Sequence, residues 1–308
     1  MCLTRLLYVM GVNMATLEAL VTEFLTDTKA RALSPGTTRW YGQTLRPFLV
    51  FALGQSVTEL TGFDARLVRL YMGECVTKLS PGGAHARMRA LRALSSYLVS
   101  EELLEVNPFN RVKLPKVPDR ALDVVSEDQF RSLMSAAGVG LNPLRDQTIF
   151  SVMFDTGLRA MELCGVRLDD VQSGEGGIMV QRGKGDKHRF VPASRWVLKT
   201  ITRYVTLERP KTAHENLFMA RGDAPLCYES LRGVIERHCI TAGLKTVRPH
   251  AFRRGFAVAY IRNGGDAFTL QRILGHTTLA MSSKYARMNV DDVKDVHSRV
   301  SPVGRSAK

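Results

Sequence analysis

Four short segments of this sequence place basic or nucleophilic side chains in contexts that packing alone explains poorly. In the first, Arg159 stands two residues after Gly157, at the expected start of a new helix. A cation at a helix start opposes the helix dipole, unless an anion docks there and meets both the guanidinium and the free backbone N–H groups. The segment therefore indicates a phosphate site or, in the alternative, an arginine that is solvated or paired with nearby Glu162.

The second segment, from Gly183 to Arg189, is the expected tip of a β-hairpin. Glycines on both sides of Lys184 let the backbone come close to a ligand while the ammonium group reaches across it. A solvated turn explains these residues equally well. A phosphate loop of the nucleotide-binding kind is excluded, because the spacing G-x-x-x-x-G-K-[ST] is missing.

The third segment pairs His250 with Arg253, three residues apart on one face of a helix whose first turn holds Pro249. A charged imidazole and a guanidinium repel each other, so the pair is tolerable at an anion site and awkward elsewhere. The fourth segment holds His276, after a Leu-Gly pair, and Tyr285 nine residues further on. Taken singly, His276 is explained as a helix cap and Tyr285 as a half-buried core residue.

A helical N-terminal region must help to position these groups. From Thr16 the apolar residues recur at helical spacing, and a second helix opens at Ser34, with an expected kink at Pro47. We expect residues 1–111 to form a small helical domain after an irregular start. Residues 112–124, rich in proline and basic side chains, are expected to form a linker.

Residues 125–308 are expected to form a second domain, mainly α-helical with a small antiparallel β-sheet and a C-terminal tail. Alternating apolar residues in 178–181 and 190–192, with turn residues between them, predict two paired strands. Local signals predict the helix ends: a capping box from Ser126 to Gln129, a stop at Gly157, a cap at Asp266 and a stop at Gly275.

Composition narrows the class of partner. The chain has 43 Lys and Arg against 29 Asp and Glu, a formal charge of +14. This charge favours a polyanionic partner such as nucleic acid over the alternative, a soluble protein whose basic surface has no such partner. The 5 scattered cysteines contain no C-x-x-C pair, predict neither a disulfide framework nor a zinc site, and fit a reducing cytosol. No apolar run approaches the roughly eighteen residues of a membrane span. The first residues make a poor signal peptide, so Met14 is a candidate translation start.

Together, the four segments match one family signature: an Arg in T-G-L-R-x-x-E-L, a Lys in a hairpin G-K-G, an H-x-x-R pair, an L-G-H, and a Tyr nine residues beyond that His. The sequence resembles the tyrosine recombinases, the phage integrase and Xer group, from residue 14 to about residue 300. The resemblance implies a helical SAM-like core-binding domain followed by an α+β catalytic domain. It assigns six active-site residues: Arg159, Lys184, His250, Arg253, His276 and Tyr285.

The resemblance implies that the chain cuts and rejoins DNA through a 3′-phosphotyrosine. Arg159 and Arg253 would hold the non-bridging phosphate oxygens and stabilise the charge that grows in the transition state. Tyr285 would attack the phosphorus, and His250 would help it to lose its proton. Lys184 would protonate the departing 5′-oxygen.

The same chemistry implies the partners. His276 would add a hydrogen bond to the phosphate, and no cofactor or metal is expected because the covalent bond conserves the energy for rejoining. Two rounds of exchange pass through a Holliday junction and require a homo-tetramer on double-stranded DNA that carries a specific core site. The apolar side chains of the tail could dock on a neighbouring protomer or, equally, on their own domain: Val290, Val293 and Val296. Basic side chains of the first domain are expected to contact backbone phosphates: Arg87, Arg89 and Arg92.

Several alternatives stay open at this point. Integration and excision of a phage or mobile element, Xer-like resolution of chromosome or plasmid dimers, and cassette capture all use this chemistry. A type IB topoisomerase uses nearly the same residues, and an inactive DNA-binding accessory protein belongs to another class. The chain enters the core-binding domain almost at once, so an additional arm-binding domain is not expected. Arg254 stands where the family often has His, at a position without a catalytic role. We expect a cytoplasmic, nucleoid-associated protein without a membrane partner.

Overall fold

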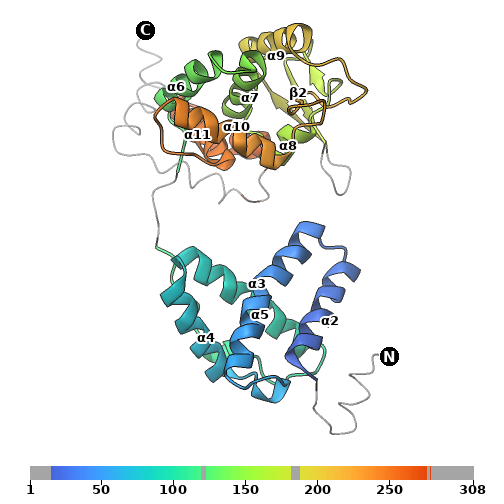
Figure 1. Ribbon diagram of the computed structural model, residues 1–308, viewed down its shortest axis with the longest axis vertical. Helices are drawn as coiled ribbons and strands as arrows, with labels where there is room; N and C mark the ends of the chain where they lie inside the picture. Colours follow the sequence, from blue (N-terminus) through green and yellow to red (C-terminus); the bar gives the residue numbers. More distant parts are fainter. Residues whose placement is uncertain (1–14, 119–122, 182–187, 276–277, 279–308) are drawn as a thin grey trace, which may run out of the picture. The chain divides into compact units, whose positions relative to one another are not determined.

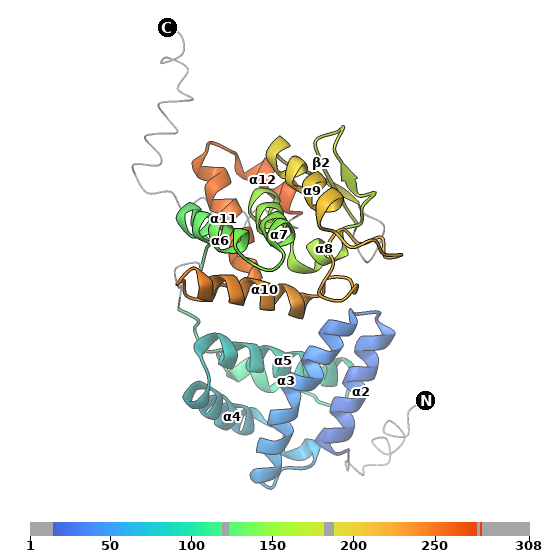
Figure 2. The ribbon, with the colours of Figure 1, turned by 45° about the horizontal axis from the view of Figure 1, so that its top comes forward.

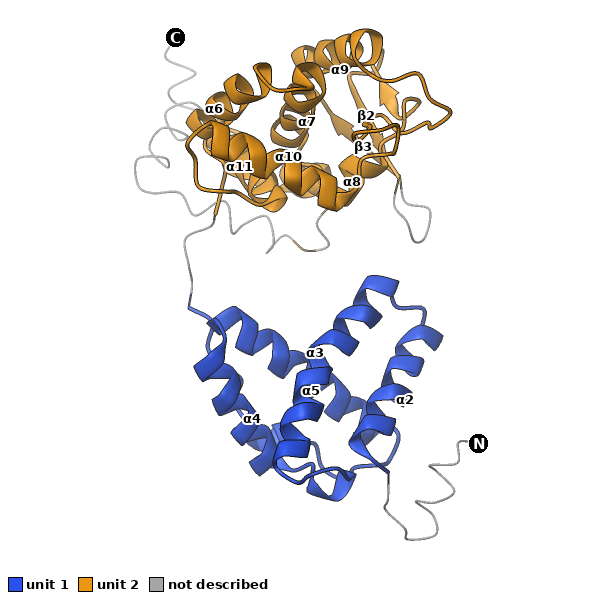
Figure 3. Ribbon diagram, in the orientation of Figure 1, with its two compact units in different colours: residues 1–120 blue, residues 121–308 orange. Residues whose placement is uncertain are grey.

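The computed structural model describes residues 15–118, 123–181, 188–275 and 278. The chain divides into two compact units, residues 1–120 and residues 121–308 (Figure 3). Both are mainly helical, and the second also holds a small antiparallel sheet. Among the described residues, no helix is long and apolar enough to cross a membrane.

The first unit is a helical cluster (Figure 1). Its elements are α2 (Leu17–Ala30), α3 (Pro35–Gly54), η1 (Leu60–Gly62), α4 (Ala65–Lys78), α5 (Pro81–Ser100) and η2 (Pro108–Arg111). A side chain caps the start of each of α2 to α5 by accepting the backbone N–H three residues later: Thr16, Ser34, Asp64 and Ser80. Helix α3 continues through Pro47, where a kink was predicted.

One apolar core holds the first unit together. Fully buried side chains from each of the four helices meet in it, and these include Leu20, Phe48, Val68, Met88 and Leu91. The segment predicted as a linker begins with Val112 and Leu114, and both pack against this core. The first residues after η2 are therefore part of the packed core of the first unit, and the linker begins after them.

The second unit is built around α7 (Pro143–Thr156), which is buried along most of its length. Figure 2 shows α7 with α6 and α11 on one side and α9 on the other, and all three pack against it. The bounds of the other helices are α6 (Glu127–Gly138), α8 (Ala160–Gly165), α9 (Arg195–Leu207), α10 (Tyr228–Thr241), α11 (Pro249–Arg262) and α12 (Ala267–Leu274).

A buried polar cluster joins α7 to α10. The Asp146 carboxylate accepts a hydrogen bond from Nε of Arg145 at 2.8 Å and lies 2.7 Å from Nε2 of His238. Burial raises the pKa of Asp146, but the hydrogen bonds from His238 and Arg145 outweigh it and hold the pKa below its usual range. The cluster therefore fastens the two helices without leaving this carboxylate unpaired.

A three-stranded antiparallel sheet lies in the order β1 (Val171–Gln172), β2 (Gly177–Val180), β3 (Arg189–Pro192). The predicted pairing of β2 with β3 is confirmed, with Ile178 opposite Val191. The short strand β1 was not predicted. Gly177 is required where β2 meets β3, because a Cβ there would lie 2.5 Å from the Val191 carbonyl oxygen.

The helix ends of the second unit follow the predicted local signals. Ser126 and Gln129 form a capping box at the start of α6. Asp266 caps α12 by accepting the N–H groups of Phe268 and Thr269. Helices α7 and α12 end at glycines in the left-handed conformation, Gly157 with φ 61° and Gly275 with φ 63°.

Candidate active site

Arg253 of α11 ties together the ends of two helices. Its Nη1 donates to the Gly157 carbonyl at 2.8 Å and its Nη2 to the Leu274 carbonyl at 2.7 Å. These carbonyls lie at the C-terminal ends of α7 and α12, where the helix dipole favours a cation. The side chain is only 1% exposed. The guanidinium is therefore held below the surface, next to Arg159.

Arg159 occupies the N-cap position of α8. Its backbone N–H donates to one oxygen of the Glu162 carboxylate and its Nη1 to the other, each at 2.8 Å. Its Nη2 lies 3.5 Å from the Gly275 carbonyl, and the side chain is 41% exposed. The pairing with Glu162 that the sequence offered as an alternative is therefore present, and it leaves part of the guanidinium open to a ligand.

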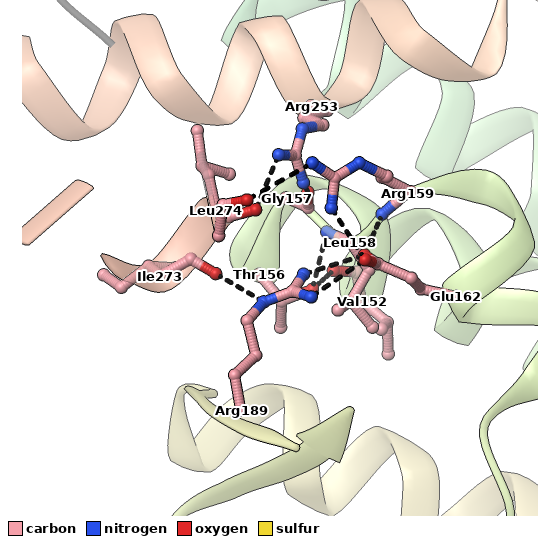
Figure 4. Close-up of polar contacts among 11 residues, drawn as sticks. Val152, Thr156, Gly157, Leu158, Arg159, Glu162, Arg189, Arg253, Ile273 and Leu274 are labelled. Carbon is pink, nitrogen blue, oxygen red and sulfur yellow. Dashed lines mark hydrogen bonds and ion pairs between the residues drawn. The ribbon is translucent and has the colours of Figure 1, made fainter. Parts of the chain in front are cut away.

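The two arginines are neighbours. Arg253 donates to the carbonyl of Leu274 (Figure 4), and Arg159 reaches the carbonyl of the next residue, Gly275. Guanidinium groups attached to consecutive carbonyls lie side by side at the end of α12. Two side chains that are far apart in the sequence thus meet at the two residues immediately before His276.

Glu162 is the carboxylate that balances this cluster. Burial raises its pKa, but hydrogen bonds from Arg189 and then from Arg159 lower the pKa from 4.5 to about 2. Arg189 donates a hydrogen bond to each oxygen of this carboxylate, from Nη1 and from Nη2, both at 2.8 Å. Glu162 is therefore ionised throughout the neutral range. In the described part of this cluster, one carboxylate lies among three arginines, and this excess of positive charge suits a phosphate.

His250 lies in the first turn of α11, exposed at the surface. Burial of part of the ring and the charges of neighbouring arginines hold the pKa of His250 below its ordinary 6.5; these are Arg254, Arg253 and Arg159. The imidazole is therefore neutral at neutral pH and can accept a proton.

Three of the six residues assigned by the resemblance are thus brought to one site: Arg159, His250 and Arg253. The other three lie outside the described residues: Lys184, His276 and Tyr285. In the sequence, His276 directly follows Gly275, and Lys184 belongs to the connection between β2 and β3. Within the described parts of the chain, no group of three or more His, Cys, Asp or Glu side chains is arranged to hold a metal ion.

The three arginines expected to contact DNA separate into two environments. Arg89 and Arg92 are exposed on α5 and line a cleft of about 300 Å³ with Trp40 and Tyr41. Arg87 is half-buried and donates from Nη1 to the Thr44 carbonyl of α3 at 3.2 Å, a contact within the unit.

Arg189 is the site residue that sequence reasoning did not single out. It stands at the end of the segment already noted for Lys184, but its partner Glu162 is 27 residues away. The pattern of residues around it carries no signal for that contact.

Comparison with known proteins places this geometry in a family. Residues 123–291 match the model of the phage integrase family. The chain is 29% identical over 282 residues to the tyrosine recombinase XerC of Pelobacter propionicus, covering 90% of this chain and 92% of that protein. It is 25% identical over 294 residues to the tyrosine recombinase XerD of Staphylococcus aureus, covering 93% and 99%.

Among solved structures, the Tn1549 transposon integrase in complex with a circular intermediate DNA has a TM-score of 0.76 at 19% identity, covering 91% of this chain and 99% of that one. This likeness shows a shared fold. The family model and the two relatives match by sequence, and these matches show the family as well as the fold. The chain belongs to the phage integrase family and is a tyrosine-type site-specific DNA recombinase.

Proposed function

We propose that the chain exchanges DNA strands at a specific double-stranded core site by forming a covalent bond between a DNA phosphate and Tyr285. One observation carries the proposal: Arg253 and Arg159 bind the carbonyls of Leu274 and Gly275, ten residues or so before Tyr285 in the sequence. Two cations fixed at that point form a receptor for a phosphodiester close to the nucleophile along the chain.

The arginines answer the first difficulty of the reaction, which is the negative charge of the phosphodiester. A guanidinium has five N–H donors, and Arg159 keeps an exposed edge beyond its bonds to Glu162. Hydrogen bonds from this edge neutralise a non-bridging oxygen and stabilise the additional charge of the pentavalent transition state. Arg253, held below the surface, supplies the second cation.

The second difficulty is proton transfer. A phenol has an unperturbed pKa near 10, so Tyr285 needs a base, and His250 is neutral at the pH of the reaction. Lys184 protonates the 5′-oxygen as the P–O bond breaks, and His276 donates a hydrogen bond to the phosphate. The products are a 3′-phosphotyrosine and a free 5′-hydroxyl. A 5′-hydroxyl from a partner duplex then attacks the phosphotyrosine and restores the DNA strand.

Each protomer cuts one strand, so the complete exchange through a Holliday junction needs four protomers on two duplexes. Integration and excision of a phage or mobile element is the first biological role that we propose. Xer-like dimer resolution is the second, because the XerC and XerD relatives are covered over 92% and 99% of their length. Because the proposed substrate is DNA, we propose that the protein acts in the cytoplasm, at the nucleoid.

The experiment begins with Tyr285→Phe, which should bind DNA without cutting it. This variant selects core sites from a randomised duplex pool, and the recovered site is rebuilt with a nick that prevents rejoining. Wild type should accumulate a covalent protein–DNA adduct on this duplex, and Tyr285→Phe should form none. Specific binding without any adduct from wild type would instead support an accessory DNA-binding protein.

A further inference from the structure

We propose that Arg189 is a positioning residue of this active site, which holds Glu162 and the end of α12 in the arrangement that catalysis by Arg159 requires. The proposal rests on the proposed function of the site. Arg189 is the first residue of β3, and its side chain is 11% exposed. It reaches two other elements, α8 and α12, with one guanidinium group (Figure 4).

The first contact saturates Glu162. One carboxylate oxygen accepts from Nη1 of Arg159 and Nη1 of Arg189, and the other accepts from the Arg159 backbone N–H and Nη2 of Arg189. Four charge-assisted or backbone hydrogen bonds fill the acceptor sites of this carboxylate. Arg159 is thereby limited to one side-chain bond with Glu162. Without Arg189, the same carboxylate would be free to take both terminal nitrogens of Arg159, and these would then be lost to a phosphate.

The second contact completes a set of three on the last turn of α12. Nε of Arg189 donates to the Ile273 carbonyl at 3.0 Å, and Arg253 and Arg159 bind the carbonyls of the next two residues in order. Carbonyls at a helix C-terminus lack partners within the helix and carry the negative end of the dipole. Three cations from three elements therefore fix the point at which the chain leaves α12 toward His276.

The geometry requires an arginine. Two parallel hydrogen bonds to one carboxylate, with a third from Nε to a carbonyl, need the planar fork of a guanidinium. A lysine supplies one charge at one point and can replace only part of this set. The proposal therefore predicts a graded order of activity, with wild type above Arg189→Lys and Arg189→Lys above Arg189→Gln.

The test measures the single-turnover rate of adduct formation on the nicked core site and, separately, the affinity for the intact site. We expect Arg189→Gln to lower the rate about tenfold or more, as for the loss of a charge-assisted hydrogen bond that orients a catalytic group, with affinity changed about twofold at most. Arg189→Lys should recover part of the rate. In a Glu162→Gln background, Arg189→Gln should lower the rate of adduct formation much less than it does in wild type.

The matched control is Arg167→Gln, which removes an arginine from an exposed ion pair with Glu215, at 55% and 69% side-chain exposure. This change should leave rate and affinity unchanged. A second readout does not need activity: amide hydrogen exchange of α12 (Ala267–Leu274) should be faster in Arg189→Gln than in Arg167→Gln.

The inference is overturned if Arg189→Gln cleaves at the wild-type rate, or if affinity falls as much as the rate. It is also overturned if α12 exchanges no faster than in the control. Absence of an adduct from wild type contradicts the proposed function alone, and hydrogen exchange then still decides the role of Arg189. If Arg189→Gln does not fold, Arg189→Lys carries the test, and a wild-type rate in that variant refutes the need for a guanidinium.

Discussion

Replacing Glu162 by Gln removes the carboxylate that Arg159 and Arg189 share, while the side chain keeps its shape. Because the pKa of Glu162 is lowered from 4.5 to about 2, the ionised form stabilises the folded protein. Each pKa unit corresponds to about 1.4 kcal/mol, so the loss in free energy of unfolding should be about 3 kcal/mol at pH 7. The side chain is 12% exposed, which limits screening by solvent.

The sign of the pH dependence follows from the direction of the shift. A carboxyl with a depressed pKa stabilises the fold above its unfolded pKa, and this contribution is lost as pH falls through the folded value. The difference between wild type and Glu162→Gln should therefore be about 1.4 kcal/mol smaller at pH 3.5 than at pH 7.

Urea unfolding can isolate the second unit, because the chain has 2 tryptophans, Trp40 in the first unit and Trp196 in the second. In a Trp40→Phe background, tryptophan fluorescence reports on Trp196 alone. We expect Glu162→Gln to lower the unfolding midpoint of this signal at pH 7 and to approach the parent as the pH falls. An equal stability at pH 7, or a deficit that does not change with pH, would refute the electrostatic role assigned to Glu162.

Three further predictions use other contacts. Because the pKa of His250 is lowered, the adduct-formation rate of wild type should stay constant from about pH 8 down to 6.5, the ordinary pKa of a histidine, and fall only below it. His250→Asn should lose this acidic limb of the pH–rate profile. Gly157→Ala should lower the free energy of unfolding by about 2 kcal/mol or more, since φ is 61° and the new Cβ would lie 2.5 Å from Phe256; urea unfolding measures it. In DNA titrations, Arg89→Gln should reduce the slope of log affinity against log salt by about one, and Arg87→Gln should change the slope little while lowering stability.

The boundaries of several elements could be predicted because their causes are local. The capping box of Ser126 and Gln129, the cap at Asp266 and the left-handed ends at Gly157 and Gly275 each involve residues within about one turn. Side-chain chemistry and spacing therefore carry the information needed. The strand pair β2–β3 was predictable for the same reason, since a short connection joins alternating apolar residues.

The contacts that assemble the site depend on residues far apart in the chain. The Arg189–Glu162 pair spans 27 residues, and the Asp146–His238 pair in the core spans 92. Nothing near any of these residues specifies its partner, because the contact exists only once α7, α8, α10 and β3 have packed. The assignment of Arg159, His250 and Arg253 to one site came from family resemblance. The structure adds what holds the two arginines: helix-end carbonyls bind Arg253, and the Glu162 carboxylate together with a helix-end carbonyl binds Arg159.

The most direct test of the account is to locate the protein–DNA bond itself. The adduct formed on the nicked core site is digested with protease and nuclease, and the modified peptide is sequenced by mass spectrometry. The account predicts a nucleotide phosphate on Tyr285, joined through the 3′ side, and a released strand that polynucleotide kinase labels without prior phosphatase because its 5′ end is a hydroxyl. A phosphate on another residue, or a released strand that carries a 5′-phosphate, would contradict the account.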